Sequence, residues 1–330
     1  MGRQLYGTLT QVFPPKPGFT EDKLPDLYGK VYIVTGSNTG VGKELARMLY
    51  SKNAKVYIAA RSEDKANKAI EEISQAYPSS KGGLVFLRLD LSDLTKIKAS
   101  TDEFLAKEKK LDVLFNNAGV QNPLPEPSKT PQGYEYHLGV NTIGTFAFTK
   151  LLTPILVSTA KTEGTARVVW VSSSGTEIAG DKSVGINMKN LDYHDDKPYL
   201  IKYGYSKVGN WLHGVEFAKR YSAEGVISIP LNPGNLASDL YRDQKGLMKL
   251  ITKIITYPSI NGAYTCLYAG LSPDITIERS GSWVIPFGRI QPIRPDLVEA
   301  TKTEEEGGNG TAKKFWDWTE EQVKKYIPLE

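Results

Sequence analysis

The sequence is poor in cysteine and histidine. Its 330 residues include one cysteine, Cys266, and three histidines, His137, His194 and His213. A single cysteine excludes an intramolecular disulfide and a zinc site built from cysteines. No two of the histidines have the helical spacing of metal ligands. The sequence therefore predicts no metal site.

Long apolar runs and a strong net charge are also missing. No segment approaches the roughly 18 consecutive apolar residues of a membrane-spanning helix. Residues 1–25 contain prolines and acidic residues where a signal peptide would need an uninterrupted apolar stretch. The formal net charge of +4 is too small and too evenly spread to indicate a nucleic-acid surface. We expect a cytoplasmic protein with no integral membrane segment and no nucleic-acid partner.

Short apolar runs alternate with segments of helical periodicity along most of the chain. The hydrophobic content of 40% is enough for a full core. Strands separated by helices require right-handed crossovers, and hence a parallel sheet covered on both faces. The pattern predicts strands at 31–35, 54–60, 84–89, 113–115, 168–171, 226–230 and 283–285, and helices at about 41–50, 62–77, 94–107, 132–158, 202–221 and 258–270.

We therefore predict one α/β domain, a doubly wound Rossmann domain with a parallel, seven-stranded sheet and helices on both faces. The domain is expected to cover residues 28–295. Residues 1–27 would be an N-terminal extension, and residues 296–330 a C-terminal tail with a helix.

A glycine-rich segment joins the first predicted strand to the first predicted helix. It reads TGSNTGVG over residues 35–42. Phosphates that accept hydrogen bonds from the free N–H groups of a helix must approach the backbone closely, which excludes side chains. An ordinary tight turn is the alternative. We predict that the following residues bind the phosphates of a dinucleotide: Gly36, Ser37, Asn38, Thr39, Gly40, Val41 and Gly42.

The end of the second predicted strand bears on the choice of cofactor. A cofactor without a 2′-phosphate is usually recognised there by an acidic residue, but this chain has Ala60 followed by Arg61. A guanidinium can pair with a 2′-phosphate through charge-assisted hydrogen bonds. The sequence therefore favours NADP(H) over NAD(H). The alternative is that Arg61 is solvated and pairs with Glu63 or Asp64.

Polar and small residues follow the third and fourth predicted strands. Asp90, followed by Leu91, could accept a hydrogen bond from the adenine amino group. The sequence NNAG at 116–119 lies at the edge where open α/β sheets bind ligands. Its small residues would let the adenosine lie against the backbone. We predict that Asp90, Leu91, Asn117, Ala118 and Gly119 contact the cofactor.

Tyr203 and Lys207 lie one helical turn apart, but this spacing alone is weak evidence. It recurs at Tyr77/Lys81, Tyr193/Lys197 and Tyr241/Lys245. Only the pair at 203 and 207 opens a long amphipathic helix, which places both side chains on one face. An ammonium so close favours the phenolate, which suits the tyrosine to proton exchange with an alkoxide.

Taken together, these motifs resemble the short-chain dehydrogenase/reductase superfamily over about residues 28–295. The resemblance implies that Tyr203 is the catalytic acid/base, that Ser173 assists it, and that Asn141 positions a water that relays protons to Lys207. It places the family's serine on Ser173 rather than on Ser172 or Ser174. It also implies that Tyr203, Lys207, Pro233, Gly234, Leu236 and Ser238 contact the cofactor, with Ser238 in place of the usual threonine.

Within the superfamily the chain resembles the retinol-dehydrogenase-like branch, and filamentous-fungal members of it. This likeness rests on GYEYHLGVN at 133–141, on the long interval between Ser173 and Tyr203, and on KFWDWTEEQV at 314–323. The superfamily resemblance also implies a substrate lid at about 239–257, with an ordinary amphipathic helix that covers the core as the alternative, and the possibility of a homodimer. A retinoid substrate does not follow from the likeness.

The function expected from the sequence is NADPH-dependent reduction of a ketone or aldehyde to an alcohol, or the reverse. The apolar residues of the expected lid suggest a small hydrophobic carbonyl or alcohol substrate, similar to a secondary metabolite. The alternative is a regulatory or scaffold protein that binds NADPH without catalysis.

Overall fold

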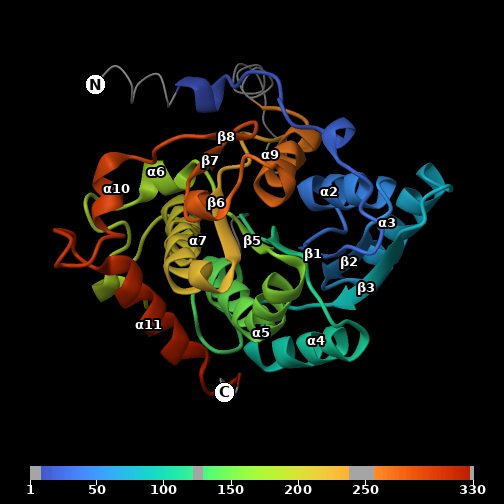
Figure 1. Ribbon diagram of the computed structural model, residues 1–330. Coiled ribbons are helices and arrows are strands. Elements are labelled where there is room, and N and C mark those ends of the chain that lie inside the picture. Colours follow the sequence, from blue (N-terminus) through green and yellow to red (C-terminus); the bar gives the residue numbers. More distant parts are fainter. Residues whose placement is uncertain (1–8, 122–128, 238–255, 328–330) are drawn as a thin grey trace, which may run out of the picture.

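A computed structural model of the protein describes residues 9–121, 129–237 and 256–327 (Figure 1). At its centre is a sheet of eight strands, within the described residues, in the order β3-β2-β1-β4-β5-β6-β7-β8. The strands are β1 (Val31–Thr35), β2 (Lys55–Ala60), β3 (Gly83–Arg88), β4 (Val113–Asn116), β5 (Ala166–Val171), β6 (Val226–Leu231), β7 (Val284–Ile285) and β8 (Arg289–Ile290).

The first seven strands are parallel and the eighth is antiparallel to the seventh. This confirms the predicted doubly wound α/β fold, with one strand more than the seven expected. The additional strand β8 has only two residues, too few for a visible pattern, and Gly288 with φ of 82° turns the chain back before it. Chain order reverses between β1 and β4, which is where such sheets bind ligands.

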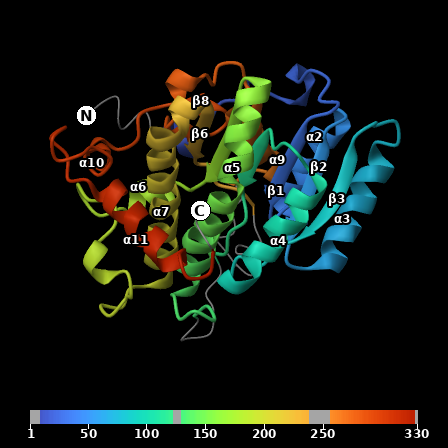
Figure 2. The same cartoon turned by 60° about the horizontal axis from the view of Figure 1, so that its bottom comes forward.

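Helices cover both faces of the sheet (Figures 1 and 2). One core contains residues of α4, α5, α7 and α11, and the other contains residues of α2, α3 and α9. The α-helices are α2 (Gly40–Ser51), α3 (Glu63–Ala76), α4 (Leu94–Lys107), α5 (Thr145–Glu163), α6 (Gly175–Ala179), α7 (Tyr199–Tyr221), α9 (Ser259–Leu271), α10 (Pro295–Glu299) and α11 (Thr311–Val323). Shorter helical turns are η1 (Glu21–Lys23), η3 (Met188–Asn190), η4 (Ser222–Glu224) and η6 (Ile277–Arg279).

The helix predicted at 132–158 begins later and has two parts. Residues 129–135 form a turn closed by a bridge between Lys129 and Glu135, with Gly133 at φ of 88°. A π-helical segment η2 (Leu138–Gly144) then leads into α5. The stretch Leu138–Glu163 is long and apolar enough to span a membrane, but 72% of its most apolar window is buried inside the protein.

Segments near both ends of the described chain pack on the domain. On the N-terminal side, Phe19, Leu24 and Leu27 are buried in the core that contains α2 and α9. On the C-terminal side, α11 lies against α7 and buries Phe315 and Trp316. Because α11 covers part of α7, pairing of two chains through that helix would compete with it. The homodimer stays a prediction.

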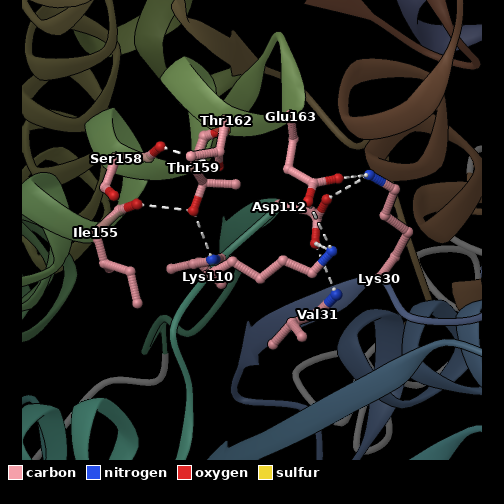
Figure 3. Close-up of polar contacts among 10 residues, drawn as sticks. Lys30, Val31, Lys110, Asp112, Ile155, Ser158, Thr159, Thr162 and Glu163 are labelled. Carbon is pink, nitrogen blue, oxygen red and sulfur yellow. Dashed lines mark hydrogen bonds and ion pairs between the residues drawn. The ribbon is translucent and has the colours of Figure 1, made fainter.

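Charged residues tie the elements together at the amino edge of the sheet (Figure 3). The Asp112 carboxylate accepts a hydrogen bond from the Val31 N–H at 2.8 Å and lies 2.9 Å from Lys30 Nζ. Lys30 in turn pairs with Glu163 at the end of α5, at 2.8 Å. This cluster fixes β1, the residue before β4, and α5 at the edge opposite the glycine-rich segment.

Candidate active site

The glycine-rich segment turns sharply from β1 into α2. Gly36 and Gly40 have φ of 67° and 57°, values that side chains disfavour. A Cβ on Gly42 would lie 2.6 Å from Asn117 Nδ2 and 2.8 Å from Gly36 O, so the first turn of α2 packs directly on the loop. The first N–H groups of α2 have no partner within their own helix and can bind an anion. Thr39 and Gly40 are exposed at this end.

Ser37 differs from the other residues of the loop. Its side chain is fully buried, and its Oγ donates to Val34 O at 2.7 Å. The hydroxyl therefore stabilises the turn, and only the backbone of Ser37 could contact a phosphate. Asn38 and Val41 are partly exposed.

Thr35 joins the ends of β1 and β4. Its Oγ1 accepts hydrogen bonds from the Asn117 and Ala118 N–H groups at 3.0 and 2.9 Å. In the other direction, Asn117 Nδ2 donates a hydrogen bond to Thr35 O at 2.8 Å. The side chain of Asn117 thus shapes the site, and Ala118 and Gly119 present a nearly bare backbone beside the glycine-rich loop.

A pocket of about 270 Å³ opens beside this backbone at the ends of β1, β2 and β3. Arg61, exposed at the end of β2, lies at this pocket with its Nη1 3.4 Å from the Tyr136 hydroxyl. Within the described residues Arg61 forms no ion pair with Glu63 or Asp64, and Glu63 pairs with Arg88. The residues lining the pocket are Gly36, Asn38, Thr39, Ala59, Ala60, Arg61, Leu89, Asp90, Leu91, Ser92, Asn117, Ala118, Gly119, Val120, Tyr136 and Val140.

Asp90 and Leu91 lie on the β3 side of the same pocket. The Asp90 carboxylate accepts hydrogen bonds from the Ser92 N–H at 3.1 Å and the Ser92 hydroxyl at 2.6 Å. These contacts hold the carboxylate in place before α4. Leu91 is 7% exposed and lines the pocket.

Ser173 follows β5 and is partly exposed, with its Oγ accepting from the Gly175 N–H at 3.1 Å. The neighbouring Ser172 is buried, and its hydroxyl contacts Thr176 Oγ1 and Lys207 O, both at 2.6 Å. Of these two hydroxyls, the one on Ser173 is therefore better placed to reach a ligand.

The helix α6 brings Ser173 and Tyr203 to the same region. A Cβ on Gly175 would lie 3.5 Å from Gly204 Cα, and Gly204 also packs closely against Ala179. Tyr203 lies next to this contact and is partly exposed. Its ring meets the His137 ring edge-on, with centroids 6.2 Å apart.

Lys207 is buried one turn beyond Tyr203. Its Nζ donates to Val171 O at 3.0 Å and lies 5.8 Å from the centroid of the Tyr203 ring. Burial lowers the pKa of Lys207 to about 8. A Cβ on Gly119 would lie 3.0 Å from this ammonium, so Lys207 Nζ lies close to the Gly119 backbone.

Asn141 is fully buried in η2 and holds three elements together. Its Oδ1 accepts from the Val120 N–H at 2.7 Å, and its Nδ2 donates to Val120 O and to Ser206 Oγ, both at 2.9 Å. A Cβ on Gly119 would also lie 3.3 Å from Asn141 Oδ1, which places this amide beside Lys207.

The segment after β6 completes the site. Gly234 has φ of 104°, and a Cβ there would lie 3.0 Å from the Phe287 ring. Leu236 bridges to Tyr257 and packs against Gly262 of α9. Pro233 and Gly234 are partly exposed at the carboxyl end of β6. Ser238 and nearly all of the expected lid, 239–257, lie outside the described residues.

Sequence reasoning assigned no site role to Thr35, Tyr136 or Ser206. Thr35 begins the glycine motif. Its polar side chain at the end of an apolar strand was the sequence signal that could have indicated a role in the site. Tyr136 lies in the segment GYEYHLGVN, but nothing local to the sequence places it opposite Arg61. Ser206 reaches Asn141 only because α7 packs on η2.

The chain is similar in sequence to known proteins over most of its length. A family model for short chain dehydrogenase matches residues 30–184. A short-chain dehydrogenase/reductase of Phomopsis amygdali is 55% identical over 324 residues, covering 96% of each chain. The short-chain dehydrogenase/reductase bet4 of Neocamarosporium betae is 51% identical over 322 residues, covering 96% of this chain and 93% of the relative.

A solved structure has a similar fold. The 3-ketoacyl-(acyl-carrier-protein) reductase of Brucella melitensis, crystallised with NADH, superposes with a TM-score of 0.61 and 21% identity. The match covers 80% of this chain and 99% of that one. This structure supports the fold, and the relatives that are 55% and 51% identical confirm the family resemblance inferred from the motifs. The chain belongs to the short-chain dehydrogenase/reductase family of oxidoreductases, which use a nicotinamide cofactor.

Proposed function

We propose that this protein is an NADPH-dependent reductase of ketones or aldehydes that also catalyses the reverse oxidation. The observation that carries the proposal is the placement of Tyr203 one helical turn from the buried Lys207 and next to the contact between Gly204 and α6, the helix that follows Ser173. A phenol, an ammonium and a hydroxyl so arranged suit proton transfer to a carbonyl oxygen.

The residues have distinct roles in this proposal. When bound, the reduced nicotinamide supplies a hydride to the carbonyl carbon of the substrate. Tyr203 gives its phenolic proton to the carbonyl oxygen, and Ser173 donates a hydrogen bond to the same oxygen as negative charge develops. The Lys207 ammonium favours the phenolate that remains, because opposite charges attract strongly where water is excluded.

Asn141 acts through Lys207. Its amide links the backbone at Val120 to α7 at Ser206, close to the ammonium. We propose that this link, and a water bound beside it, return a proton to the tyrosine through Lys207 after each turnover.

The proposed preference for NADPH rests on Arg61. It is exposed at the end of β2, at the mouth of the pocket lined by Asp90 and Ala118, and it is not neutralised by Glu63. Ala60 before it offers no carboxylate to bind the hydroxyls of an unphosphorylated ribose or to repel a phosphate. A 2′-phosphate at this strand end would thus meet a guanidinium that forms no ion pair within the described residues, next to a residue, Ala60, that has no carboxylate.

The proposal is tested by turnover with NADPH against aromatic, steroidal and polyketide-like ketones. The decisive variant is Tyr203→Phe, which keeps the ring and removes the proton. We expect it to lose at least about a hundredfold in kcat, in the range of general acid catalysis, while NADPH still binds. Turnover within a few-fold of the wild type would show that Tyr203 is not the acid. Binding of NADPH without reduction of any ketone would instead favour a regulatory or scaffold role.

A further inference from the structure

The side chain of Gln11, in the N-terminal extension, connects two elements at the carboxyl edge of the sheet. It lies on a single helical turn, the blue turn nearest the N label in Figure 1. Gln11 Nε2 donates to Glu177 Oε2 at 2.7 Å, and Gln11 Oε1 accepts from Asn232 Nδ2 at 2.9 Å. Glu177 belongs to α6, and Asn232 is the first residue after β6. One glutamine side chain therefore bridges two elements that follow different strands.

This bridge joins elements that lie beyond the last paired residues of the two strands. The parallel register of β5 and β6 ends with the pair Val171 and Leu231. From there one chain leads into α6, and the other leads into the turn at Pro233 and Gly234. The strands position α6 and the turn only where these begin. The Gln11 side chain adds a second connection between them.

The two groups that Gln11 binds are also held by the rest of the domain. Asn232 is 2% exposed, and its Oδ1 accepts from the Gly234 N–H at 3.0 Å, so its carboxamide fixes the turn. Glu177 Oε1 accepts from the Arg294 N–H at 3.1 Å. Gln11 is therefore the middle link of a series of hydrogen bonds that runs from Arg294 through α6 to Gly234.

The pattern of donors and acceptors in this series suits a carboxamide at position 11. Glu177 offers only acceptors, because an ionised carboxylate has no proton to donate. Asn232 presents a donor, because its oxygen already binds the Gly234 N–H. The side chain between them must donate to one and accept from the other, and a glutamine does both.

The segment that carries Gln11 is itself anchored on the domain. Arg289 of β8 donates to Thr10 O at 2.7 Å. Further along the extension, Phe19 packs edge-on against Tyr268 of α9, with ring centroids 6.2 Å apart. Gln11 is thus attached to a fixed part of the protein, and its hydrogen bonds restrain the two groups that it binds.

The bridged elements are the parts of the site that must keep their relative position during hydride transfer. Ser173 lies just before α6, and its Oγ accepts from the Gly175 N–H at 3.1 Å at the start of that helix. The turn at Pro233 and Gly234 is the part expected to contact the cofactor. A displacement of about 1 Å from the productive geometry can cost about a hundredfold in rate. A connection that fixes the spacing of these two parts therefore bears on the chemical step.

We propose that Gln11 is a positioning residue for the reaction. It holds α6, and with it Ser173, in place relative to the turn that contacts the cofactor. The inference rests on the proposed function, because it concerns the hydroxyl and the cofactor turn of that reaction. It makes the N-terminal extension a part of the framework of the active site.

The test uses the pattern of donors and acceptors in the full-length protein. Gln11→Glu places a second carboxylate opposite Glu177, so the donor between them is lost and the two charges repel. Glu177→Gln leaves the bridge one acceptor short. The double variant Gln11→Glu/Glu177→Gln restores the pattern: the new carboxylate at position 11 accepts from Asn232 and from the new amide at position 177, whose oxygen still accepts from the Arg294 N–H. Its net charge equals that of the wild type.

Gln75→Glu is the matched control. Gln75 lies in the second half of α3, and its Nε2 donates to Glu71 Oε1 at 3.1 Å, so this variant also places a carboxylate opposite a glutamate. Four quantities are measured for each protein. They are the Kd of NADPH, the rate of NADPH oxidation in a single turnover with the ketone that the wild type reduces fastest, the hydrogen-exchange rate of the peptide 232–237, and the midpoint of urea unfolding.

Each single variant should lose at least about fivefold in the single-turnover rate and bind NADPH at least about threefold more weakly. The peptide 232–237 should exchange faster in the single variants, because the turn is released. The double variant should return to within about twofold of the wild type in rate and in Kd, and Gln75→Glu should stay within the same limits. A purely structural role would lower the urea midpoint and leave the single-turnover rate of the folded protein unchanged.

Single variants that match Gln75→Glu in rate and in Kd would overturn the proposal. Losses that the double variant does not recover would also overturn it, because they would arise from damage other than the loss of this bridge. If the wild-type protein reduces no ketone, the proposed function fails separately. The Kd of NADPH and the exchange rate of the turn in the same variants then decide whether Gln11 holds the turn.

Discussion

Replacing Arg61 by alanine should change the cofactor preference without disturbing the fold. Arg61 is exposed, makes no ion pair within the described residues, and has a single long contact, 3.4 Å, to the Tyr136 hydroxyl. Its removal therefore leaves no buried group unpaired. If it binds the 2′-phosphate, Arg61→Ala removes at least one charge-assisted hydrogen bond, worth about 1.5–3 kcal/mol.

Because about 1.4 kcal/mol corresponds to a tenfold change, the Kd of NADPH should rise about 10- to 140-fold. The Kd of NADH should stay within about twofold, since NADH has no phosphate at that position. Both constants can be measured by fluorescence titration, and kcat/KM with each cofactor gives an independent check. Ala60→Asp should shift the preference in the same direction, by repelling the phosphate and offering the NADH ribose an acceptor.

Lys65→Ala is the matched control for Arg61→Ala. Lys65 is exposed on the first turn of α3, so the variant loses the same charge near the same strand end. A decrease in NADPH affinity equal in the two variants would mean that only the net charge matters. An unchanged ratio of NADPH to NADH affinity in Arg61→Ala would refute the reasoning, because the guanidinium would then face solvent in the complex too.

Three further predictions concern the framework of the site. Gly42→Ala should weaken NADPH binding about tenfold or more, because its Cβ would lie 2.6 Å from Asn117 Nδ2; Gly18→Ala, where a Cβ meets nothing within 4 Å, is the control in the same titration. Burial lowers the pKa of Lys207 to about 8 from 10.5, so below pH 8 its buried charge destabilises the folded state. This destabilisation is lost as the pH rises from 8 to 10.5, because the unfolded state then binds more protons than the folded state. In urea titrations across this range, the free energy of unfolding should therefore rise by up to about 3 kcal/mol relative to Lys207→Met. No rise relative to that variant would show that the ammonium is not desolvated. Asp112→Ala should lower the free energy of unfolding by about 1.5–3 kcal/mol, because the Val31 N–H loses a charged acceptor. The Kd of NADPH should stay unchanged, because the candidate cofactor site lies at the opposite edge of the sheet. A weaker affinity for NADPH would show that the two edges are coupled.

Local sequence patterns were sufficient for the first seven strands, for the long helices between them and for the class of the fold. The apolar run before residue 36, the glycines at 36, 40 and 42, and the helical periodicity after them specify a strand, a turn and a helix through interactions between near neighbours. The same holds for Tyr203 and Lys207, because one helical turn places both side chains on one face whatever surrounds them. These features carried the predicted fold and the family resemblance, and both are confirmed.

Tertiary structure decided what depends on contacts between distant residues. The packing of α7 on β5 and η2 produces three such contacts. It buries Lys207 next to Gly119, brings the Asn141 amide to Ser206, and brings the Ser172 hydroxyl to Lys207 O. The start of the helix at 136 rather than 132 was set by a bridge between residues 129 and 135.

The position of the N-terminal segment is the clearest case of this dependence. Gln11 lies 166 residues from Glu177 and 221 from Asn232 in the chain, and no periodicity links positions so far apart. Its hydrogen bonds exist because β5 and β6 pair side by side and the extension packs past α9 to their carboxyl ends. Sequence determined the chemical groups of this protein, and the packing of the sheet and its helices decided which of them meet.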